Sequence, residues 1–400
     1  DGCLHQDVAI PLTVVPTVTG AYVVWSPPEV APEVLGPVYQ ALSASGEEIK
    51  VLPNLALLDS LSEVEGLFVI LGVYGKNHVL TQTEGQMLAD YLDGGGRLYM
   101  EGGDTWAYDP WTDVHHYFQV KGLADGGQTF PGPVDGRHFC YGQNFNVNLW
   151  HPVNTFIDQL ALRLNSGAIP LLSDDWLTGT DLAISYEDPD LGYRTIAASL
   201  PLAALVEMGQ GTVDQLVLRY LDFFENGYPG CTVDEECDDG VICTLDQCED
   251  GECDNHTVSD CTVCEDDRDC AEDEACVISN GICVDISGER YDSADTPIII
   301  SADGPGVHVS TISVPDPSLV EDVYVQVRIA HAYPGDLEYT LTHAGYSLTL
   351  KHAQPGLKGD GIFLTYDKGV DPWPLDLSVF DGLPMNGGWT LTVTDVMGLH

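Results

Sequence analysis

Basic residues are scarce in this sequence. Lys and Arg number 14 against 63 Asp and Glu, which gives the 400 residues a formal net charge of −49 at pH 7. Nucleic acids and anionic membrane surfaces are bound through clusters of Lys and Arg, so the composition argues against both as partners. The excess of carboxylates instead favours solubility, cation binding and a salty or calcium-bearing exterior.

Long apolar runs and an initiator Met are also missing. Because no stretch of about 20 apolar residues occurs, no transmembrane span is predicted. The sequence starts at Asp1 without a signal peptide, so we expect a processed product or part of a longer polypeptide. Hydrophobic residues still make up 44% of the chain, which is enough for packed cores, and this length predicts roughly two to four domains.

Cysteine is distributed unevenly. Cys3 and Cys140 stand alone, whereas the other ten of the twelve Cys fall in one stretch that has few large apolar side chains. Disulfides are expected to replace a core there, most simply as three bridges among the first six Cys and two among the last four, with the connectivity left open. The ten residues are Cys231, Cys237, Cys243, Cys248, Cys253, Cys261, Cys264, Cys270, Cys276 and Cys283.

Zinc is the alternative ligand of such cysteines. Zinc knuckles pair cysteines as C-x2-C, and within the cluster only Cys261 and Cys264 have that spacing, so disulfides are favoured and no zinc is expected. Disulfides persist in oxidising compartments, which predicts a secreted or surface-exposed protein. Since a free thiolate rarely persists there, we also predict a Cys3–Cys140 disulfide rather than a catalytic Cys140.

Residues 20–228 alternate between short apolar runs and amphipathic segments. Such runs suit strands buried on both faces, and their alternation with helices predicts an α/β fold with a doubly wound parallel sheet. A long insert rich in Gly, aromatic residues and His follows the fourth strand. The expected strands are Gly20–Trp25, Glu48–Leu52, Gly66–Val73, Arg97–Glu101 and Arg194–Ser199, and the expected helices are Pro32–Ser45, Thr83–Leu92, Val153–Leu164 and Val213–Asn226.

The C-terminal part has a different pattern. Residues 286–400 alternate apolar and polar positions between Gly, Pro and Asp turns, which predicts an all-β sandwich. Its expected strands are Val307–Pro315, Val323–Ile329, Leu337–Thr342, Ser347–Leu350 and Trp389–Thr394. The predicted domains are therefore a strand or linker at 1–19, the α/β domain at 20–228, the disulfide module at 229–285 and the sandwich at 286–400.

Four parts of the chain resemble known families. YLDGGGRLYMEGGDTW and YRTIAASLPLAALVEMGQGTVDQLVLRYLDFFE resemble flavodoxin-like, glutamine-amidotransferase-like domains over about 200 residues. C-x5-C-DDG-x2-C-T-x-D-x-C resembles the acidic Cys-rich repeats of large secreted myxobacterial proteins. HAYPGDLEYTL and NGGWTLTVTD resemble the proprotein-convertase P domain, a jelly-roll-like sandwich, over about 110 residues. Residues 7–15 resemble the closing strand of an immunoglobulin-like domain, with an ordered arm as the alternative.

The P-domain resemblance implies a further strand after Asp395. The expected sandwich therefore lacks its last strand, unless a tail or another molecule supplies one. The amidotransferase resemblance implies a nucleophilic Cys on a sharp elbow after a strand. At that place the sequence reads Gly102-Gly103-Asp104-Thr105, which predicts the fold without the nucleophile and Asp104 as a turn or cap residue, with catalysis by Asp104 as the alternative.

Several polar residues follow the predicted strands of the α/β domain. Open α/β sheets bind ligands at the carboxyl ends of strands, which makes Tyr74, Asn77, Gly103 and Asp104 candidates for a small-ligand pocket. No Gly-rich phosphate-binding motif occurs, so no nucleotide is expected. The four histidines of the insert fit no zinc motif and are expected to be packing or surface residues; they are His115, His116, His138 and His151.

Calcium is the expected ligand of the sandwich. Ca²⁺ takes six to eight oxygen ligands, and carboxylates gathered at one end of a sandwich repel one another unless a cation neutralises them. The candidate ligands are Asp336, Asp360, Asp367 and Asp395, with loop hydrogen bonding as their alternative role. No EF-hand loop is present. Asn255-His256-Thr257 is a glycosylation sequon, which matters only in a host that glycosylates such sites.

These features favour a non-catalytic extracellular protein with a structural, adhesive or assembly role. Its expected partners are other subunits or domains of the same assembly. One alternative follows from the P-domain resemblance, because P domains commonly follow catalytic domains: the chain would be the C-terminal accessory region of a secreted bacterial protease. The second alternative is that residues 20–228 form a hydrolase or a small-ligand receptor.

Overall fold

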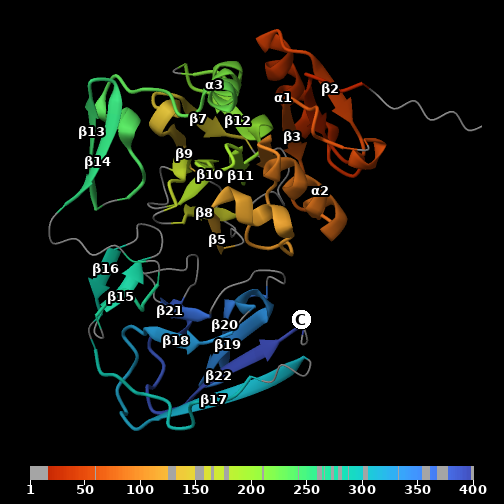
Figure 1. Ribbon diagram of the computed structural model, residues 1–400. Coiled ribbons are helices and arrows are strands. Elements are labelled where there is room, and N and C mark those ends of the chain that lie inside the picture. The colour runs from red at the N-terminus through yellow and green to blue at the C-terminus, as the bar shows by residue number, and fades with distance from the viewer. Residues whose placement is uncertain are drawn as a thin grey trace, which may run out of the picture.

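The computed structural model consists of a mixed α/β region, two disulfide-bonded hairpins and a β-sandwich (Figure 1). No helix among the described residues is long and apolar enough to cross a membrane. The structure describes residues 17–58, 60–124, 132–148, 157–163, 166–174, 180–209, 211–241, 243–258, 264, 266–271, 274–277, 282–286, 288–300, 305–331, 333–353, 361–366 and 377–397.

Five parallel strands form one half of the α/β sheet. Their order is β2-β1-β3-β4-β11, and every residue of β1 and β3 is buried. Burial on both faces explains why these strands are continuous apolar runs. The strands are β1 (Tyr22–Trp25), β2 (Ile49–Leu52), β3 (Gly66–Ile70), β4 (Arg97–Glu101) and β11 (Arg194–Ala198), close to the predicted positions.

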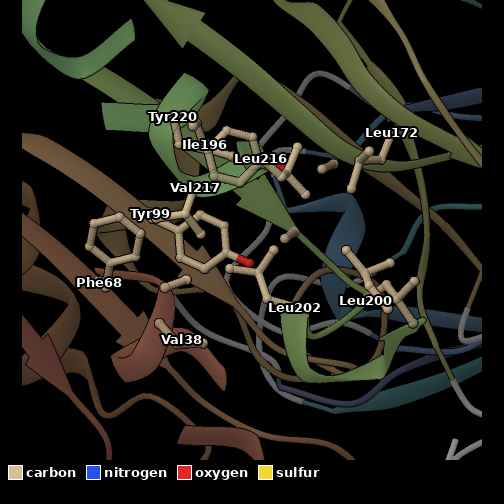
Figure 2. Close-up of a cluster of buried hydrophobic side chains, with 14 of the residues drawn as sticks. Val38, Phe68, Tyr99, Leu172, Ile196, Leu200, Leu202, Leu216, Val217 and Tyr220 are labelled. Atoms are coloured by element: carbon tan, nitrogen blue, oxygen red, sulfur yellow. The ribbon is translucent and has the colours of Figure 1, made fainter. Parts of the chain in front are cut away.

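Helices cover both faces of these strands. α1 (Pro32–Ser45) and α3 (Val213–Asn226) contact each other and pack on one face. α2 (Gln82–Asp93) packs on the other, after a capping box in which Thr81 and Glu84 satisfy each other's backbone N–H groups. Figure 2 shows the first face, where Tyr220 of α3 stacks on Tyr99 with ring centroids 5.8 Å apart.

The other half of the sheet is antiparallel, which corrects the expectation of a purely parallel sheet. β10 pairs with β11 and then with β9 and β8, so the described strands of this region form one mixed sheet of twelve. The added strands are β5 (Val120–Ala124), β6 (Val134–Gly136), β7 (Asn144–Val147), β8 (Gln159–Leu162), β9 (Ile169–Asp174), β10 (Asp181–Glu187) and β12 (Leu205–Glu207).

The predicted helix Val153–Leu164 is wrong at its described positions. Gln159–Leu162 forms β8, which pairs with β5 and β10, and all four of its residues are buried. A helix packed on a sheet buries one stripe only, whereas an interior strand buries both faces. Tertiary pairing therefore overrides a local pattern that suits either structure.

The Cys-rich region forms two hairpins. β13 (Thr244–Glu249) and β14 (Glu252–Thr257) are held by Cys231–Cys248 and Cys237–Cys253. β15 (Glu274–Val277) and β16 (Ile282–Asp285) are held by Cys264–Cys276 and Cys270–Cys283. Cys243 is also disulfide-bonded, and Cys261 lies outside the described residues. These crosslinks agree with the predicted disulfide module.

The sandwich has a four-stranded antiparallel sheet, ordered β17-β22-β19-β20, and a two-stranded sheet, β18-β21. Their inner faces enclose a core that includes Tyr339, Tyr366 and Phe380. The predicted strands were right to within two residues, and β21 was missed. The strands are β17 (Gly306–Val314), β18 (Val325–Ile329), β19 (Leu337–His343), β20 (Tyr346–Lys351), β21 (Ile362–Tyr366) and β22 (Gly387–Asp395).

Reduction of the disulfides is expected to unfold the two hairpins and to leave the parallel sheet folded. The described side chains of β13 and β14 are exposed or half-buried, whereas β1 and β3 are fully buried. Hydrogen exchange of the full chain with and without a reductant would show this as lost protection in β13–β16 and retained protection in β3 and β4. Equal loss of protection in β3 and β4 at the same reductant concentration would contradict the expectation.

Candidate functional site

The carboxyl ends of the parallel strands are closed by tight backbone contacts. The Gly102 N–H donates to the carbonyl of Ala198 at 3.0 Å, and the Gly103 N–H donates to that of Gly72 at 2.9 Å. Gly72 has a φ of 80°, and a Cβ there would lie 2.8 Å from the Lys76 carbonyl oxygen. A Cβ on Gly102 would lie 2.0 Å from Thr105 Oγ1. Glycine is therefore needed for the loops to approach each other this closely.

Asp104 lies in the turn that follows β4. It is 2% exposed, and its backbone carbonyl accepts from Asp109 N–H at 2.7 Å. Buried Asp158 holds the next residues, because its Oδ2 accepts from the N–H groups of Trp106 at 2.7 Å and Ala107 at 2.8 Å. The position where the amidotransferase resemblance implies a nucleophile is thus a buried turn.

The four pocket candidates are only partly brought together. Gly103 and Asp104 are buried, whereas Tyr74 is 49% exposed. Asn77 Nδ2 donates to Asp109 Oδ2 at 3.5 Å. An open groove does exist along α2, lined by residues that include Val64, Gly95 and Arg97, and it contains none of the candidates. A ligand pocket at the carboxyl ends stays a prediction.

Sequence reasoning missed His78, which joins two carboxylates at the carboxyl ends of the parallel strands. Its Nδ1 contacts Glu29, and its Nε2 lies 3.1 Å from Glu84 Oε2. The hydrogen bond from His78 lowers the pKa of Glu29. The ring also meets Trp25 edge-on, with centroids 5.6 Å apart. The imidazole therefore fastens the segment after β1 to the start of α2. The capping pattern at Thr81 pointed to Glu84, but nothing local pointed to Glu29.

Glu101 was also missed, although it ends a predicted strand. Its side chain is fully buried, and its Oε2 accepts from Tyr99 Oη at 2.6 Å and from the Leu202 N–H at 3.0 Å. Burial raises the pKa of Glu101 to about 7. The sequence signal that could have indicated a buried carboxyl group was its position as the last residue of an apolar strand, because strand ends reach the edge of the core.

Cys140 is a free thiol and not the disulfide partner that was predicted. It is fully buried in the core cluster beneath α3, and burial raises its pKa. Packing in the core replaces the bridge as its structural role, and a protonated buried thiol is inert. Cys3 lies outside the described residues.

The described insert histidines pack against aromatic rings. His115 stacks on Trp111 with centroids 5.3 Å apart, and His116 meets the same indole edge-on at 5.5 Å. His138 meets Tyr228 edge-on at 5.5 Å. Burial lowers the pKa of both His115 and His138 to about 4, so both rings are neutral at pH 7. His151 lies outside the described residues.

Two of the proposed calcium ligands meet at one end of the sandwich. Asp336 and Asp395 are 0% and 2% exposed, and the Val396 N–H donates to the Asp336 carbonyl at 3.0 Å. Lys351 Nζ donates to the Leu337 carbonyl at 2.9 Å beside them, and burial lowers its pKa to about 8. His331 Nε2 lies 3.8 Å from Asp395 Oδ2. The end of the sandwich therefore contains oxygen donors that suit Ca²⁺, with the ammonium group of Lys351 beside them. Asp360 and Asp367 lie outside the described residues.

Asn255 of the sequon lies on β14, directly opposite Asp246 of β13. Its side chain is half-buried. Glycosylation of Asn255 stays a prediction.

Comparison with known proteins identifies the sandwich. Residues 320–399 match the family model of the proprotein convertase P-domain, which agrees with the resemblance seen in the sequence. These residues include the strands from β18 to β22. A search of curated proteins found no match to the chain.

Solved structures give only weak likenesses. The exo-β-1,4-mannosidase Op5Man5 from Opitutaceae bacterium strain TAV5 is 14% identical, with a TM-score of 0.33 over 52% of this chain and 34% of that chain. A GMP synthase subunit from Thermoplasma acidophilum is 10% identical, with a TM-score of 0.34 over 51% and 94%. A ThuA-like protein from Bacteroides uniformis is 13% identical, with a TM-score of 0.33 over 54% and 95%. At these TM-scores none of the likenesses carries an argument about function.

The P-domain match and the disulfide-rich region together indicate an extracellular accessory or structural role. Disulfide bonds are compatible with a secreted protein. The P-domain match also indicates that the sandwich associates with another domain.

Replacing Glu101 by Gln is expected to stabilise the protein at pH 8 and to change little at pH 5. The folded-state pKa of Glu101 is raised to about 7, so the wild type loses stability as the pH rises from the unfolded value towards 7. Gln keeps an acceptor for Tyr99 and Leu202 but carries no charge. The gain is at most about 3–4 kcal/mol, because each unit of pKa corresponds to about 1.4 kcal/mol.

Thermal unfolding at the two pH values would measure this effect. Exposed Glu207→Gln is the matched control and should show no such difference. An unchanged or lower melting temperature of the Glu101→Gln variant at pH 8 would contradict a buried, proton-binding Glu101.

Proposed function

We propose that this chain is a non-catalytic structural, adhesive or assembly part of a larger secreted or surface polypeptide, such as a fibre or matrix component. In it, the disulfide-bonded hairpins join a flavodoxin-like domain to a P-domain-like sandwich. The observation that supports this is that each hairpin docks on a different domain through charged side chains. Asp104 lies in a buried turn at the position where the amidotransferase resemblance implies a nucleophile. This supports a structural role for the α/β domain, in which its surface makes contacts, over a catalytic role.

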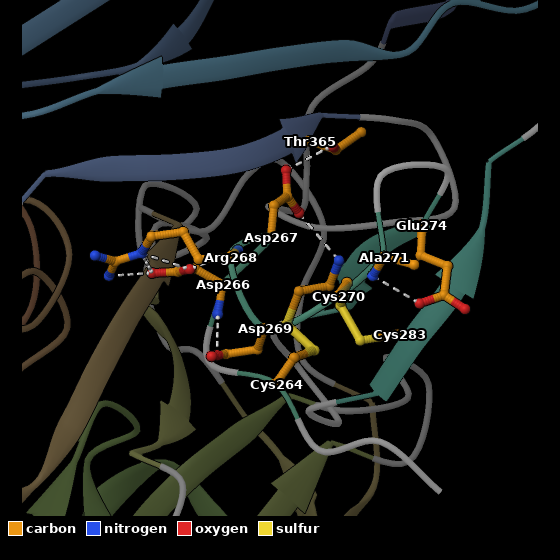
Figure 3. The surroundings of a disulfide bond; sticks show 11 residues. Cys264, Asp266, Asp267, Arg268, Asp269, Cys270, Ala271, Glu274, Cys283 and Thr365 are labelled. Atoms are coloured by element: carbon orange, nitrogen blue, oxygen red, sulfur yellow. Dashed lines mark hydrogen bonds and ion pairs between the residues drawn. A yellow bond between two sulfur atoms is a disulfide. The ribbon is translucent and has the colours of Figure 1, made fainter. Parts of the chain in front are cut away.

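The second hairpin docks on the sandwich through Asp267, which is 4% exposed (Figure 3). Its N–H donates to the Phe363 carbonyl of β21 at 2.9 Å. Its Oδ2 accepts from Thr365 Oγ1 at 2.7 Å, and its Oδ1 accepts from the Cys276 N–H at 3.0 Å. One carboxylate thus bonds both to the disulfide-held hairpin and to the sandwich.

Arg268 strengthens the same contact. Its guanidinium carbon lies 4.2 Å from the centroid of the Phe363 ring, and its Nη2 lies 2.6 Å from Asp266 Oδ2. The carboxylate orients the guanidinium, and an arginine over an aromatic face is attractive. The backbone bond from Asp267 to Phe363 also occupies one acceptor of β21, a strand that pairs with β18 in the described part of the chain.

The first hairpin docks on the α/β region. Arg137 Nη1 lies 2.6 Å from Asp238 Oδ2. Gly240 sits so close that a Cβ would be 2.9 Å from both Leu162 and Pro170, and Val241 packs against the core of that region. An ion pair, a close backbone approach and apolar packing thus hold the first hairpin against the α/β region. Each hairpin therefore has one defined neighbour, the α/β region for the first and the sandwich for the second.

Replacing Asp267 by Ala is expected to loosen the sandwich contact. Hydrogen bonds to a charged group contribute roughly 1.5–3 kcal/mol, so amide exchange in β21 and β15 should speed up by about tenfold or more. Hydrogen exchange with mass spectrometry on the full chain would measure this. Asp254→Ala, which removes an exposed carboxylate from β14, is the control and should leave β21 unchanged. If exchange in β21 were the same in both variants, docking through Asp267 would be ruled out.

The alternative favoured by the P-domain match is an accessory region of a secreted protease. On this alternative the sandwich stabilises or targets a catalytic domain encoded upstream. Sequencing the gene upstream of Asp1 would separate the two functions. A subtilisin-like or metalloprotease motif there would overturn the structural proposal, and further extracellular modules would support it.

Calcium binding at the end of the sandwich belongs to the same proposal. Asp336 and Asp395 would supply carboxylate oxygens, with Asp360 and Asp367 as the remaining candidates. Because a ligand that binds only the folded state stabilises it, excess chelator is expected to lower the melting temperature of the sandwich by several degrees. The Asp395→Asn variant should lose this response. If chelator left the melting temperature of the wild type unchanged, calcium binding by the sandwich would be contradicted.

A further inference from the structure

The strands of the sandwich differ in how their edges are protected from pairing with other strands. A free edge presents unpaired N–H and C=O groups, and proteins usually protect it with a charged residue, a bulge or a covering segment. β20 contains Lys351 and has a register shift against β19, and β18 contains Arg328. In β21 the Phe363 carbonyl is already bonded to the second hairpin. Each of these strands therefore has a feature that discourages a further partner.

β17 (Gly306–Val314) has none of these features. It pairs with β22 over its 9 residues without a register shift, and with no other strand in the described part of the chain. Its sequence GVHVSTISV contains no Pro and no Asp, Glu, Lys or Arg, in a chain whose net charge is −49. Figure 1 shows β17 at the margin of the sandwich. A straight, uncharged edge that is rich in β-branched residues suits the addition of another strand.

One hydrogen bond shows which backbone groups of β17 point to its free edge. The Thr311 N–H donates to Asp295 Oδ2 at 3.2 Å, so it points away from β22. Alternate residues of an antiparallel strand point their backbone groups the same way, which places those of Val307 and Val309 at the same edge. Because Asp295 already occupies the edge at Thr311, the stretch that is open to a partner is 306–310.

The side chains of this open stretch are apolar on the outer face of the sheet. Val307 is 64% exposed and Val309 is 50% exposed. Their register partners on β22 are Thr394 and Thr392, which are uncharged. Two copies of a chain with so many carboxylates repel each other least where both present an uncharged surface. The open stretch of β17 is such a surface.

The open stretch is also complementary to itself. An antiparallel pairing with a second copy, centred on His308, sets Val307 opposite the partner's Val309 in both directions. Each of these pairs exchanges two N–H···O=C bonds, because both residues point their backbone groups outward. The neighbouring registers are poorer, since they set a valine against Pro305, which has no N–H, or against Thr311, whose N–H is already bonded.

We propose that β17 pairs with β17 of a second copy of this chain, as antiparallel strands about a twofold axis at His308. The proposal rests on the assembly role proposed above and names its partner. The two four-stranded sheets then form one continuous sheet across both copies. Because each copy carries a net charge of −49, salt that screens the repulsion between them favours the dimer.

Sedimentation velocity of the full oxidised chain would test the association. The wild type is expected to be monomeric at low ionic strength and to dimerise as sodium chloride is added. Val309→Pro removes an N–H that points to the free edge and spares the ladder to β22, so its dimer should be weaker by about tenfold or more, because both copies lose a hydrogen bond. Val309→Thr keeps the N–H and a branched side chain, and this matched control should still dimerise.

Hydrogen exchange of the wild type would locate the interface without any variant. The Val307 and Val309 amides should be protected in proportion to the fraction of dimer. The Thr311 amide, which is bonded to Asp295 within one copy, should be protected equally in monomer and dimer.

Three results would overturn the proposal: a wild type that stays monomeric at every salt concentration, a dimer in which the Val307 and Val309 amides exchange freely, or a Val309→Pro dimer as tight as that of the wild type. An added peptide of sequence GVHVSTISV that protects these amides in a chain that does not dimerise would also overturn it, and would assign the edge to a strand of another protein. None of these results would alter the docking of the hairpins, which the Asp267→Ala variant tests separately.

Discussion

The disulfides of residues 231–283 impose the constraint on which the arrangement of this protein depends. The described side chains of β13 and β14 are exposed or half-buried, so in the first hairpin crosslinks take the place of a core. With the backbone held in this way, Asp238 and Asp267 can stand at fixed positions and meet partners in the neighbouring domains. Covalent structure in the middle of the chain therefore holds in place the two carboxylates that bond to the neighbouring parts.

Two of the few basic residues take part in the contacts between the hairpins and their neighbours. Only 14 basic residues balance 63 acidic ones, yet Arg137 and Arg268 both stand where a hairpin meets a domain. Arginine suits such places because its planar guanidinium pairs with a carboxylate and stacks on a ring at once. Elsewhere burial favours the neutral forms of ionisable groups, since it raises the pKa of Glu101 to about 7 and lowers that of His138 to about 4.

The sequence predicted the elements whose signals are local. Continuous apolar runs located β1, β3 and β4, the Thr81 capping pattern located α2, and the P-domain motif located the sandwich that the family model confirms. Features that depend on distant pairing were missed. Gln159–Leu162 reads equally well as helix or strand, and pairing with β5 and β10 decides between them. Likewise Asp267 is one carboxylate in an acidic run, and nothing local indicates that it bonds to Thr365 of β21.

The central claim is that each hairpin moves with its own neighbour. Double electron–electron resonance on the full oxidised chain tests it most directly, with spin labels carried by non-natural amino acids at exposed positions. One pair, at Leu218 and Glu252, reports on the first hairpin and the α/β region; the other, at Asp269 and Ser347, reports on the second hairpin and the sandwich. If each hairpin is docked, the distance between the two spin labels of each pair should have a single narrow distribution. A broad distribution for either pair would contradict it, because that hairpin would then be a tether and not a docked connector.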